Sequence, residues 1–254
     1  MRVRVIDIET SGTEPPAPPA SGICELGWCD VVSTTAGPDQ QPLGWEVQGP
    51  PQSVLINPGC PIPPEVSAVH HIIDEDVAAA PQFLEAAFHI LADASVDLFA
   101  AHNAKFERTF ISDQATAGRK WLCSYKLALR LWKDEPHHSN QALRYSRKPA
   151  GLDRAIANVA HRAGPDAYVT AFHLRDMLNE GHKIEHLVAR SYQPALLITC
   201  HIGKERGKKW SEVDSGFLNW MLDKDFDEDA LFTARYWLEQ RRKAAAGEAT
   251  DDNH

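Results

Sequence analysis

The sequence predicts an α/β fold: a mixed five-stranded sheet flanked by helices, followed by a small C-terminal appendage. Three strand-like runs come first, and two shorter runs then alternate with segments of helical periodicity. This order of elements is typical of a mixed sheet with helices on both sides. A basic and aromatic stretch after Gly181 breaks this pattern and predicts the appendage.

The five strands are expected where the composition is strand-like, at residues 2–8, 23–32, 54–56, 96–101 and 121–124. Prolines between the first two strands predict a stiff loop directly after the first. A helix is expected to open at Pro81, because its apolar residues follow the i, i+3, i+4, i+7 spacing of one helix face: Leu84, Ala87, Phe88 and Leu91. A second helix follows the fourth strand and carries Phe106 and Glu107.

A later helix has a clear start and a clear end. Pro165 suits its first turn, and Gly181 suits its C-terminal stop. Its apolar stripe consists of Ala167, Ala171, Leu174 and Leu178. Asp166 then lies in the first turn and His161 lies on the preceding loop, so both side chains can approach one site.

Changes in composition divide the chain into three parts. Residues 1–182 form the first domain and contain every candidate catalytic residue. Residues 195–243 form a basic and aromatic module that ends in a helix beginning near Asp227. Residues 244–254 are expected to be a disordered tail.

The composition is that of a soluble globular protein. The chain has 254 residues, of which 43% are hydrophobic and 24% charged. No apolar run approaches the roughly 20 residues of a membrane span, and the N-terminus lacks a secretory signal. Five scattered cysteines without a C-x-x-C pair indicate reduced thiols. We therefore expect a cytoplasmic protein that does not associate with membranes.

The net charge of −9 argues against broad non-specific adhesion to a polyanion. It does not exclude an enzyme that acts on nucleic acid, because bound divalent cations locally reverse the charge of a carboxylate cluster. The net charge therefore does not decide whether the protein acts on nucleic acid, and the sequence motifs must be considered.

Two carboxylates stand one residue apart where the first strand ends. Asp7 and Glu9 are at positions i and i+2, so their side chains share one face of the strand. Two carboxylates this close repel each other unless a cation lies between them. A solvated strand end is the alternative for an isolated pair, so the interpretation depends on motifs further along the chain.

Two such motifs follow: Ala101–Glu107 (A-H-N-A-K-F-E) and His161–Ala167 (H-R-A-G-P-D-A). In order and separation, these segments and the Asp7/Glu9 pair resemble the three exonuclease motifs of the DEDDh family of 3′–5′ exonucleases. The resemblance covers residues 1 to about 180. It implies a ribonuclease-H-like fold and the hydrolysis of terminal phosphodiester bonds to nucleoside 5′-monophosphates.

A narrower resemblance extends over most of the chain. Segments at 121–132, 139–143, 202–210 and 217–220 are similar to the exodeoxyribonuclease branch of the same family. This similarity favours DNA 3′ ends as the substrate. The catalytic motifs do not separate DNA from RNA, so a DEDDh exoribonuclease with identical chemistry is the first alternative.

The resemblance assigns roles to five catalytic residues. Two divalent ions, Mg²⁺ or Mn²⁺, would be held by four carboxylates: Asp7, Glu9, Glu107 and Asp166. Asp7 would bridge both ions, Glu9 and Asp166 would serve the nucleophile side, and Glu107 the other ion. His161 would accept the proton of the attacking water, a task that suits histidine because its charge changes near neutral pH. A surface or capping role is the alternative for this histidine.

Nine further residues are candidate contacts to nucleic acid: Thr10, Ser11, Gly12, His70, Asn103, Phe106, Lys204, Arg206 and Lys208. By the resemblance, the Thr10–Gly12 stretch contacts the terminal nucleotide. His70 has a structural role as its equal alternative, and Asn103 either shapes the site or caps the helix after it. The basic residues between 204 and 208 could grip phosphate beside tryptophans that stack on bases, or form a solvated charge run.

Glu107 departs from the family pattern, which has aspartate at this position. The extra methylene moves the carboxylate by about 1.5 Å, which is large against the tolerance of a preorganised site. A shifted helix or a bridging water would preserve activity, and this is the expected outcome. A weakened second cation site would instead give a catalytically impaired nucleic-acid-binding protein, the second alternative.

Overall fold

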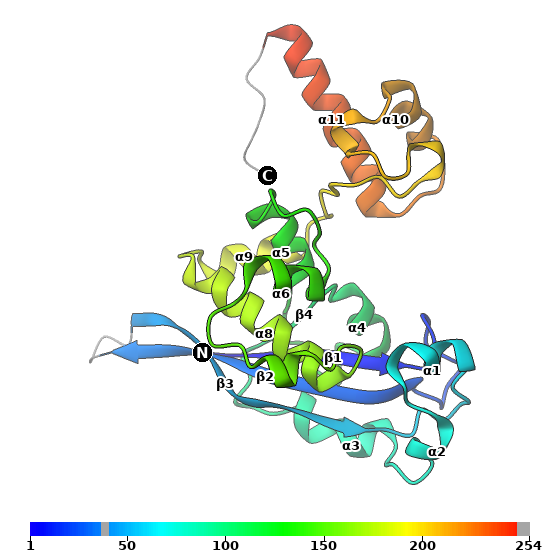
Figure 1. The fold of residues 1–254 in the computed structure, drawn as a ribbon, viewed down its shortest axis with the longest axis vertical. Helices are drawn as coiled ribbons and strands as arrows, with labels where there is room; N and C mark the ends of the chain where they lie inside the picture. The colour runs from blue at the N-terminus through cyan, green and yellow to red at the C-terminus, as the bar shows by residue number, and fades with distance from the viewer. Residues whose placement is uncertain (37–40, 248–254) are drawn as a thin grey trace. The chain divides into compact units, whose positions relative to one another are not determined.

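The computed structural model describes residues 1–36 and 41–247 (Figure 1). The chain forms two compact units. The first consists of residues 1–125 and 136–188, and the second of residues 126–135 and those from 189 onward. Each unit is considered by itself.

The first unit is built on a five-stranded sheet with the order β3-β2-β1-β4-β5. Strand β1 (Arg2–Thr10) pairs antiparallel with β2 (Ile23–Ala36), which pairs antiparallel with β3 (Gln41–Leu55). On its other side, β1 pairs parallel with β4 (Leu98–Ala101), and β4 with β5 (Trp121–Cys123). The predicted mixed five-stranded sheet is confirmed.

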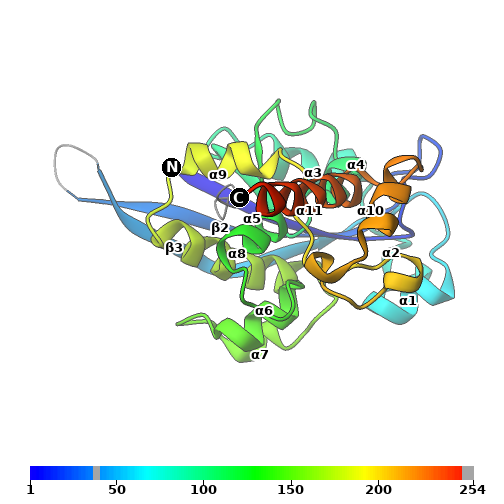
Figure 2. The same cartoon turned by 90° about the horizontal axis from the view of Figure 1, so that it is seen from above.

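Strand β3 is much longer than the predicted run of 54–56, because glycine and proline hide it in the sequence. Gly49, Pro50 and Pro51 interrupt any strand pattern. The structure accommodates them at the sheet edge, where a missing N–H costs least. The register skips there, from Trp28 opposite Gln52 to Asp30 opposite Gln48. Figures 1 and 2 show β2 and β3 extending past the other strands at their far ends.

The helices of the first unit lie on both faces of the sheet. They are α1 (Pro64–His70), α2 (Asp74–Val77), α3 (Phe83–Leu91), α4 (Lys105–Phe110), α6 (Asn140–Arg147), α7 (Arg154–Ala157) and α8 (Ala163–Asn179), and α5 (Ser124–Leu131) and α9 (Ile184–Ser191) cross the boundary between the units. Figure 1 shows α8 against one face and α3 against the other. None of the helices in the described part of the chain is long and apolar enough to cross a membrane.

The buried face of α3 differs from the predicted one. Leu84 is 72% exposed and Phe88 is 66% exposed. The residues that pack against the sheet are Ala86, Ala87, Ile90 and Leu91. The helix begins two residues after Pro81, and its packed face is centred one residue away from the predicted stripe. Spacing alone could not decide between these overlapping faces.

Helix α8 was predicted correctly. It begins before Pro165, buries its apolar stripe, and ends just before Gly181, which has a positive φ of 88°. Such a backbone angle is easy for glycine and costly for other residues.

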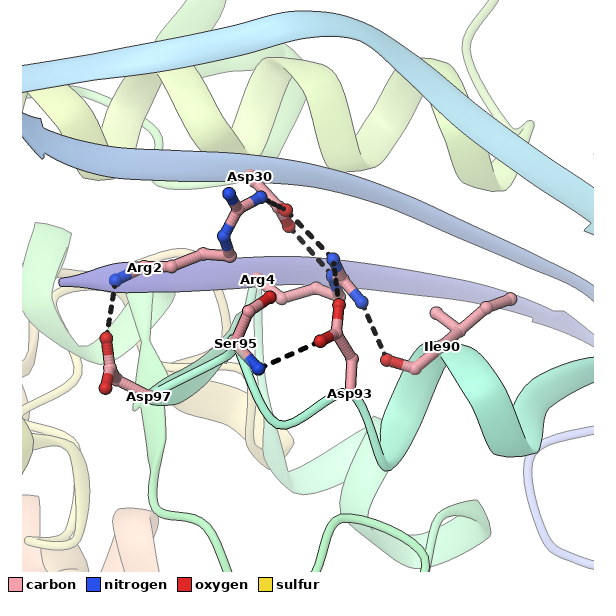
Figure 3. A network of polar contacts seen from close by, with 7 residues as sticks. All are labelled: Arg2, Arg4, Asp30, Ile90, Asp93, Ser95 and Asp97. Atoms are coloured by element: carbon pink, nitrogen blue, oxygen red, sulfur yellow. Dashed lines mark hydrogen bonds and ion pairs between the residues drawn. The ribbon is translucent and has the colours of Figure 1, made fainter.

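A buried arginine ties the sheet to α3 (Figure 3). Arg4 donates from Nε to Asp30 Oδ1 at 2.8 Å, from Nη2 to Asp30 Oδ2 at 2.9 Å, and from Nη1 to the Ile90 carbonyl at 2.8 Å. Asp93 lies 3.2 Å from Nη2. Because the guanidinium is paired on all sides, its burial is tolerated, and it fixes the end of α3 against β1 and β2.

The second unit has a core of its own. It contains two short 3₁₀ helices (Gly203–Glu205 and Trp210–Glu212), α10 (Ser215–Leu222) and α11 (Glu228–Ala246). Apolar residues from these elements and from the segments beside them form one cluster: Cys200, Trp210, Val213, Leu218, Met221, Ala230 and Ala234. The predicted terminal helix begins as expected, with Asp227 as its N-cap.

Helix α11 continues to Ala246, so residues 244–246 are helical and were wrongly assigned to the predicted disordered tail. The remainder of that prediction, from residue 248 onward, lies outside the described residues.

Candidate active site

The alternation of side chains along β1 places Asp7 and Glu9 on the α8 face of the sheet. Their neighbours Ile6 and Ile8 point the other way and join the core that includes α3. Because successive strand residues face opposite sides, the two carboxylates share the remaining face. The expected pairing of these side chains is therefore present.

Three carboxylates meet at this face. Asp7, Glu9 and Asp166 each offer an oxygen, and these oxygens all lie within 4.8 Å of one another. Asp166 comes from the first turn of α8, as predicted. Glu107, in the first turn of α4, is 3% exposed and is not a member of this tight group.

A glycine allows α8 to approach the sheet at this point. Gly27 of β2 lies directly opposite Asp7 in the β1–β2 register. A Cβ atom on Gly27 would lie 2.1 Å from the carbonyl carbon of Ala163 and 2.2 Å from the amide nitrogen of Gly164. Backbone atoms cannot yield at such distances, so the absence of a side chain lets α8 bring Asp166 beside Asp7.

Gly27→Ala is expected to displace the start of α8 and to lower the free energy of unfolding by about 3 kcal/mol or more. The displaced carboxylate should also weaken the stabilisation that divalent cations give to the fold. Urea unfolding with and without Mn²⁺ measures both effects. Gly44→Ala on β3 is the matched control, because its Cβ would meet only side-chain atoms, at 3.3 Å or more. Equal stability of the two variants would contradict the argument.

Glu25 anchors the beginning of α8. It pairs with Glu9 across β1 and β2 and is 1% exposed. Its carboxylate accepts from Arg162 Nε and Nη2, both at 2.9 Å, and from the Ala163 N–H at 3.1 Å. Burial opposes its ionisation, but these hydrogen bonds outweigh that effect and lower the pKa of Glu25. Arg162 therefore holds a charged Glu25 next to the three-carboxylate group.

The side chain of Asp166 is oriented from two sides. Its Oδ1 accepts from Gln141 Nε2 at 2.7 Å, and its Oδ2 accepts from the His161 backbone N–H at 2.6 Å. Gln141 is in turn held by Arg144, whose Nη1 donates to Gln141 Oε1 at 3.0 Å. Helix α6 and the loop before α8 thus together determine the position of this carboxylate.

His161 lies on the loop before α8, as predicted, and is exposed. Its backbone is left-handed, with a φ of 58°. This conformation directs its backbone N–H to Asp166, so the residue adjoins the three-carboxylate group through its main chain.

The carboxylates destabilise one another when no cation is bound. Burial, followed by the charges of Asp166 and Glu107, raises the pKa of Asp7 well above its ordinary value. Burial, followed by the charges of Asp166 and Glu25, raises the pKa of Glu9 to about 8. Both groups resist ionisation because they are buried and because the site concentrates negative charge.

Like Asp7 and Glu9, Glu107 is difficult to ionise unless a cation lies nearby. Burial raises its pKa to about 8, with a further contribution from the charge of Glu9. Its Oε2 is buried and makes no hydrogen bond within the described structure. An orphaned carboxylate oxygen near three others fits a site for a hard divalent cation, which prefers oxygen ligands.

These pKa shifts predict how stability depends on pH. The folded protein holds protons on Glu9 and Glu107 that the unfolded chain releases near pH 4.5, so stability falls as the pH rises from about 5 through about 8. Divalent cations should reverse this loss, raising Tm more at pH 8 than at pH 5.5. Thermal unfolding in EDTA and in Mn²⁺ at both pH values measures this; a pH-independent Tm in EDTA would contradict it.

The Thr10–Gly12 stretch forms a fixed turn at the end of β1. Thr10 Oγ1 donates to the Gly12 carbonyl at 2.6 Å, and the Ser11 N–H donates to the Gly22 carbonyl at 2.7 Å. The turn directly follows the carboxylate pair. Its contact with a terminal nucleotide stays a prediction.

His70 is 2% exposed and lies behind this turn. Its Nδ1 accepts from the Ile72 N–H at 3.0 Å, which leaves Nε2 to donate to the Thr10 carbonyl at 3.3 Å. Burial lowers the pKa of His70, in keeping with a neutral ring. These internal hydrogen bonds give His70 a structural role, which was one of the two alternatives predicted for it. Its contact with substrate stays a prediction.

Asn103 does not cap α4. Ala104 holds the N-cap position without a side-chain hydrogen bond, and Asn103 precedes it in a left-handed conformation with a φ of 75°. Asparagine tolerates this backbone better than most residues. Asn103 is exposed, and Phe106 is half-buried with its ring 5.2 Å from that of Phe110. Their contacts to substrate stay predictions.

The three basic candidate residues of the second unit, Lys204, Arg206 and Lys208, are exposed. Lys204 and Arg206 lie on and after the first 3₁₀ helix, and Lys208 forms an ion pair of 2.7 Å with the buried Glu205. Lys208 is therefore already engaged in an ion pair within the second unit. Binding of phosphate by these residues stays a prediction.

Comparisons with known proteins agree with this geometry. The RNase_T family model, described as Exonuclease, matches residues 5–173. Exodeoxyribonuclease 10 of Escherichia coli K12 is 32% identical over 248 residues, covering 93% of this chain and 99% of that protein. DNA polymerase III subunit epsilon of Treponema pallidum is 28% identical over 149 residues, covering 53% of this chain and 66% of that protein.

A solved structure is also similar. Exonuclease X in complex with 5′-overhanging duplex DNA has a TM-score of 0.55 and is 30% identical. The match covers 74% of this chain and 99% of that one.

Proposed function

The chain belongs to the DEDDh family of exonucleases, and we propose that within this family it is a metal-dependent 3′–5′ exodeoxyribonuclease. Its ribonuclease-H-like fold and its class as a phosphodiester hydrolase follow from membership. One observation carries the proposal: Asp7, Glu9 and Asp166 converge within 4.8 Å at a position adjoining His161. The similarity to an exodeoxyribonuclease over nearly the whole chain supports DNA as the substrate.

The residues have separable tasks in this reaction. Asp7, Glu9, Asp166 and Glu107 would hold two divalent cations, Mg²⁺ or Mn²⁺, which when bound activate a water and stabilise the leaving 3′-oxygen. His161 accepts the proton of the attacking water from its exposed loop position.

The surrounding residues fix this geometry. Glu25 and Arg162 secure the start of α8, and Gln141 orients Asp166. Preorganisation of this kind is effective because small misplacements of catalytic groups are costly.

The decisive assay uses single-stranded DNA, duplex DNA and RNA, each labelled at the 5′ end, with Mg²⁺ or Mn²⁺. We expect a ladder of labelled DNA strands shortened from the 3′ end and nucleoside 5′-monophosphates as products. Faster cleavage of RNA would establish the exoribonuclease alternative. Release of the labelled nucleotide first would overturn the direction, and binding without turnover would indicate an impaired enzyme.

Glu107→Asp tests how the chain accommodates its longer ligand. Glu107 is enclosed by the protein at 3% exposure, so we infer that α4 is placed to suit glutamate. The shorter side chain should then fall short, lowering activity in Mg²⁺ by about tenfold, since misplacement by 1 Å can cost up to about 10²-fold. In Mn²⁺ the difference in activity between Glu107→Asp and the wild type should be smaller, because Mg²⁺ demands near-ideal octahedral geometry.

Initial rates at saturating DNA in each cation measure this effect. Glu107→Gln is the companion variant, since it keeps the length and removes the charge. A several-fold gain for the aspartate variant would show that the wild-type site is impaired.

A further inference from the structure

A hollow in the first unit lies between α6 and α7, apart from the carboxylates. Its volume is about 370 Å³, within the range of small-molecule sites. Six residues line it: Arg144, Tyr145, Lys148, Pro149, Leu152 and Arg154. Lys148 ends α6 in a left-handed conformation, with a φ of 50°, and the turn after it leads to Arg154 at the start of α7.

The lining combines unpaired positive charge with an accessible aromatic ring. Lys148 and Arg154 are exposed, and neither has an ion-pair partner within the described residues. Tyr145 is 60% exposed, and the guanidinium carbon of Arg144 lies 4.7 Å from the centre of its ring. Cations bind phosphate oxygens and exposed rings stack on bases, so the two features together suit a nucleotide.

The local charge contrasts with that of the whole protein. Residues 144–154 contain four basic residues and one acidic residue, in a chain with a net charge of −9. The acidic residue, Asp153, is engaged as the N-cap of α7, where it accepts from the Ala155 N–H at 2.8 Å. An anion should therefore be drawn to this hollow more than to the average surface.

The hollow is joined to the active site by hydrogen bonds. Arg144 is 5% exposed and is anchored to the Ala157 carbonyl at 2.5 Å and to the Asn158 side chain. The same guanidinium holds Gln141, which donates to Asp166. A ligand stacked beside Arg144 would thus contact the guanidinium group that holds Gln141, and Gln141 orients the carboxylate of Asp166.

We propose that this hollow is a nucleoside-phosphate subsite, with the base on Tyr145 and the phosphate between Lys148 and Arg154. The nucleotide comes either from a nucleic-acid strand or from the free monophosphate. Binding there needs neither a cation nor hydrolysis, so the proposal goes beyond the proposed function and can fail independently of it.

The test is equilibrium binding of a fluorescent single-stranded DNA oligonucleotide, and separately of dAMP, to the full chain in EDTA. The double variant Lys148→Ala/Arg154→Ala should reduce the slope of log affinity against log salt by about 1.4, the value for two lost phosphate contacts on a single strand. Tyr145→Ala should weaken binding by about tenfold without changing that slope. These side chains are exposed, so Tm should remain that of the wild type.

The matched control is Lys120→Ala/Lys183→Ala, which removes the same charge from two exposed positions outside the hollow. It should leave the salt slope unchanged. Loss of oligonucleotide binding alone assigns the subsite to the strand, whereas a parallel loss of dAMP binding assigns it to the free nucleotide as well. Wild-type binding of both ligands by the hollow variants overturns the proposal, even if the protein cleaves DNA.

Discussion

Replacing Asp7 by alanine is expected to abolish hydrolysis and to leave the cation-free protein at least as stable as the wild type. The catalytic loss should be at least about 10³-fold, because Asp7 lies at the centre of the charge that would hold both cations. The stability argument comes from the raised pKa of this carboxyl group, caused by burial and by Asp166 and Glu107. Replacing this carboxyl group by a methyl group removes both the cost of burying it and its repulsion with the neighbouring carboxylates.

Asp166→Ala should be equally inactive but less stable, and this difference is a sharp test. The Asp166 carboxylate accepts from Gln141 and from the His161 N–H, and alanine would leave these donors unpaired. Each of these lost hydrogen bonds is expected to cost about 0.5–1.5 kcal/mol.

Turnover of labelled DNA and urea unfolding in EDTA measure the two effects. Retention of more than a few per cent of activity by Asp7→Ala would remove Asp7 from the proposed cation site. Equal stability of both variants in EDTA would show that Asp166 is not anchored as the structure indicates.

The residues that converge at the site were predictable because local geometry brings them there. Asp7 and Glu9 share a face through the two-residue period of a strand, and Asp166 was placed by a proline at the start of its helix. The family resemblance then joined segments that local patterns could not connect. The mixed sheet followed from the order of strand and helix signals along the chain.

The supporting residues were not predictable from the sequence. Glu25 faces Glu9 only through the β1–β2 register, and Gln141 reaches Asp166 only because α6 packs near α8. Gly27 reads as an ordinary strand glycine until the start of α8 is placed against it. These contacts depend on strand pairing and packing between separate segments of the chain, for which the sequence carries no periodic signal.

Local conformation explains the remaining differences. Asparagine is a residue type favoured at the N-cap, but Asn103 has a left-handed backbone and lies one residue before Ala104, which is the N-cap of α4. His70 lies among residues that resemble a substrate-contacting segment, yet both of its ring nitrogens are used inside the protein. Composition indicates which roles a side chain can have, and the backbone decides between them.

Removal of the His161 imidazole is expected to lower the rate of hydrolysis by about 10²–10⁴-fold, the usual contribution of a positioned proton acceptor. His161→Asn is the variant to use, because the left-handed φ of 58° is tolerated by asparagine and costs alanine about 1–2 kcal/mol. The asparagine variant should also keep the N–H donor to Asp166.

Single-turnover rates with excess enzyme, together with the rise of Tm on adding Mn²⁺, separate proton transfer from cation binding. His161→Asn should lose rate while its Tm still responds to Mn²⁺ as the wild type does. His182→Asn, at an exposed histidine beyond the C-terminal end of α8, should leave both unchanged. Full activity in His161→Asn would exclude histidine as the proton acceptor, whereas loss of the Mn²⁺ response would mean that this loop acts by holding Asp166 in place.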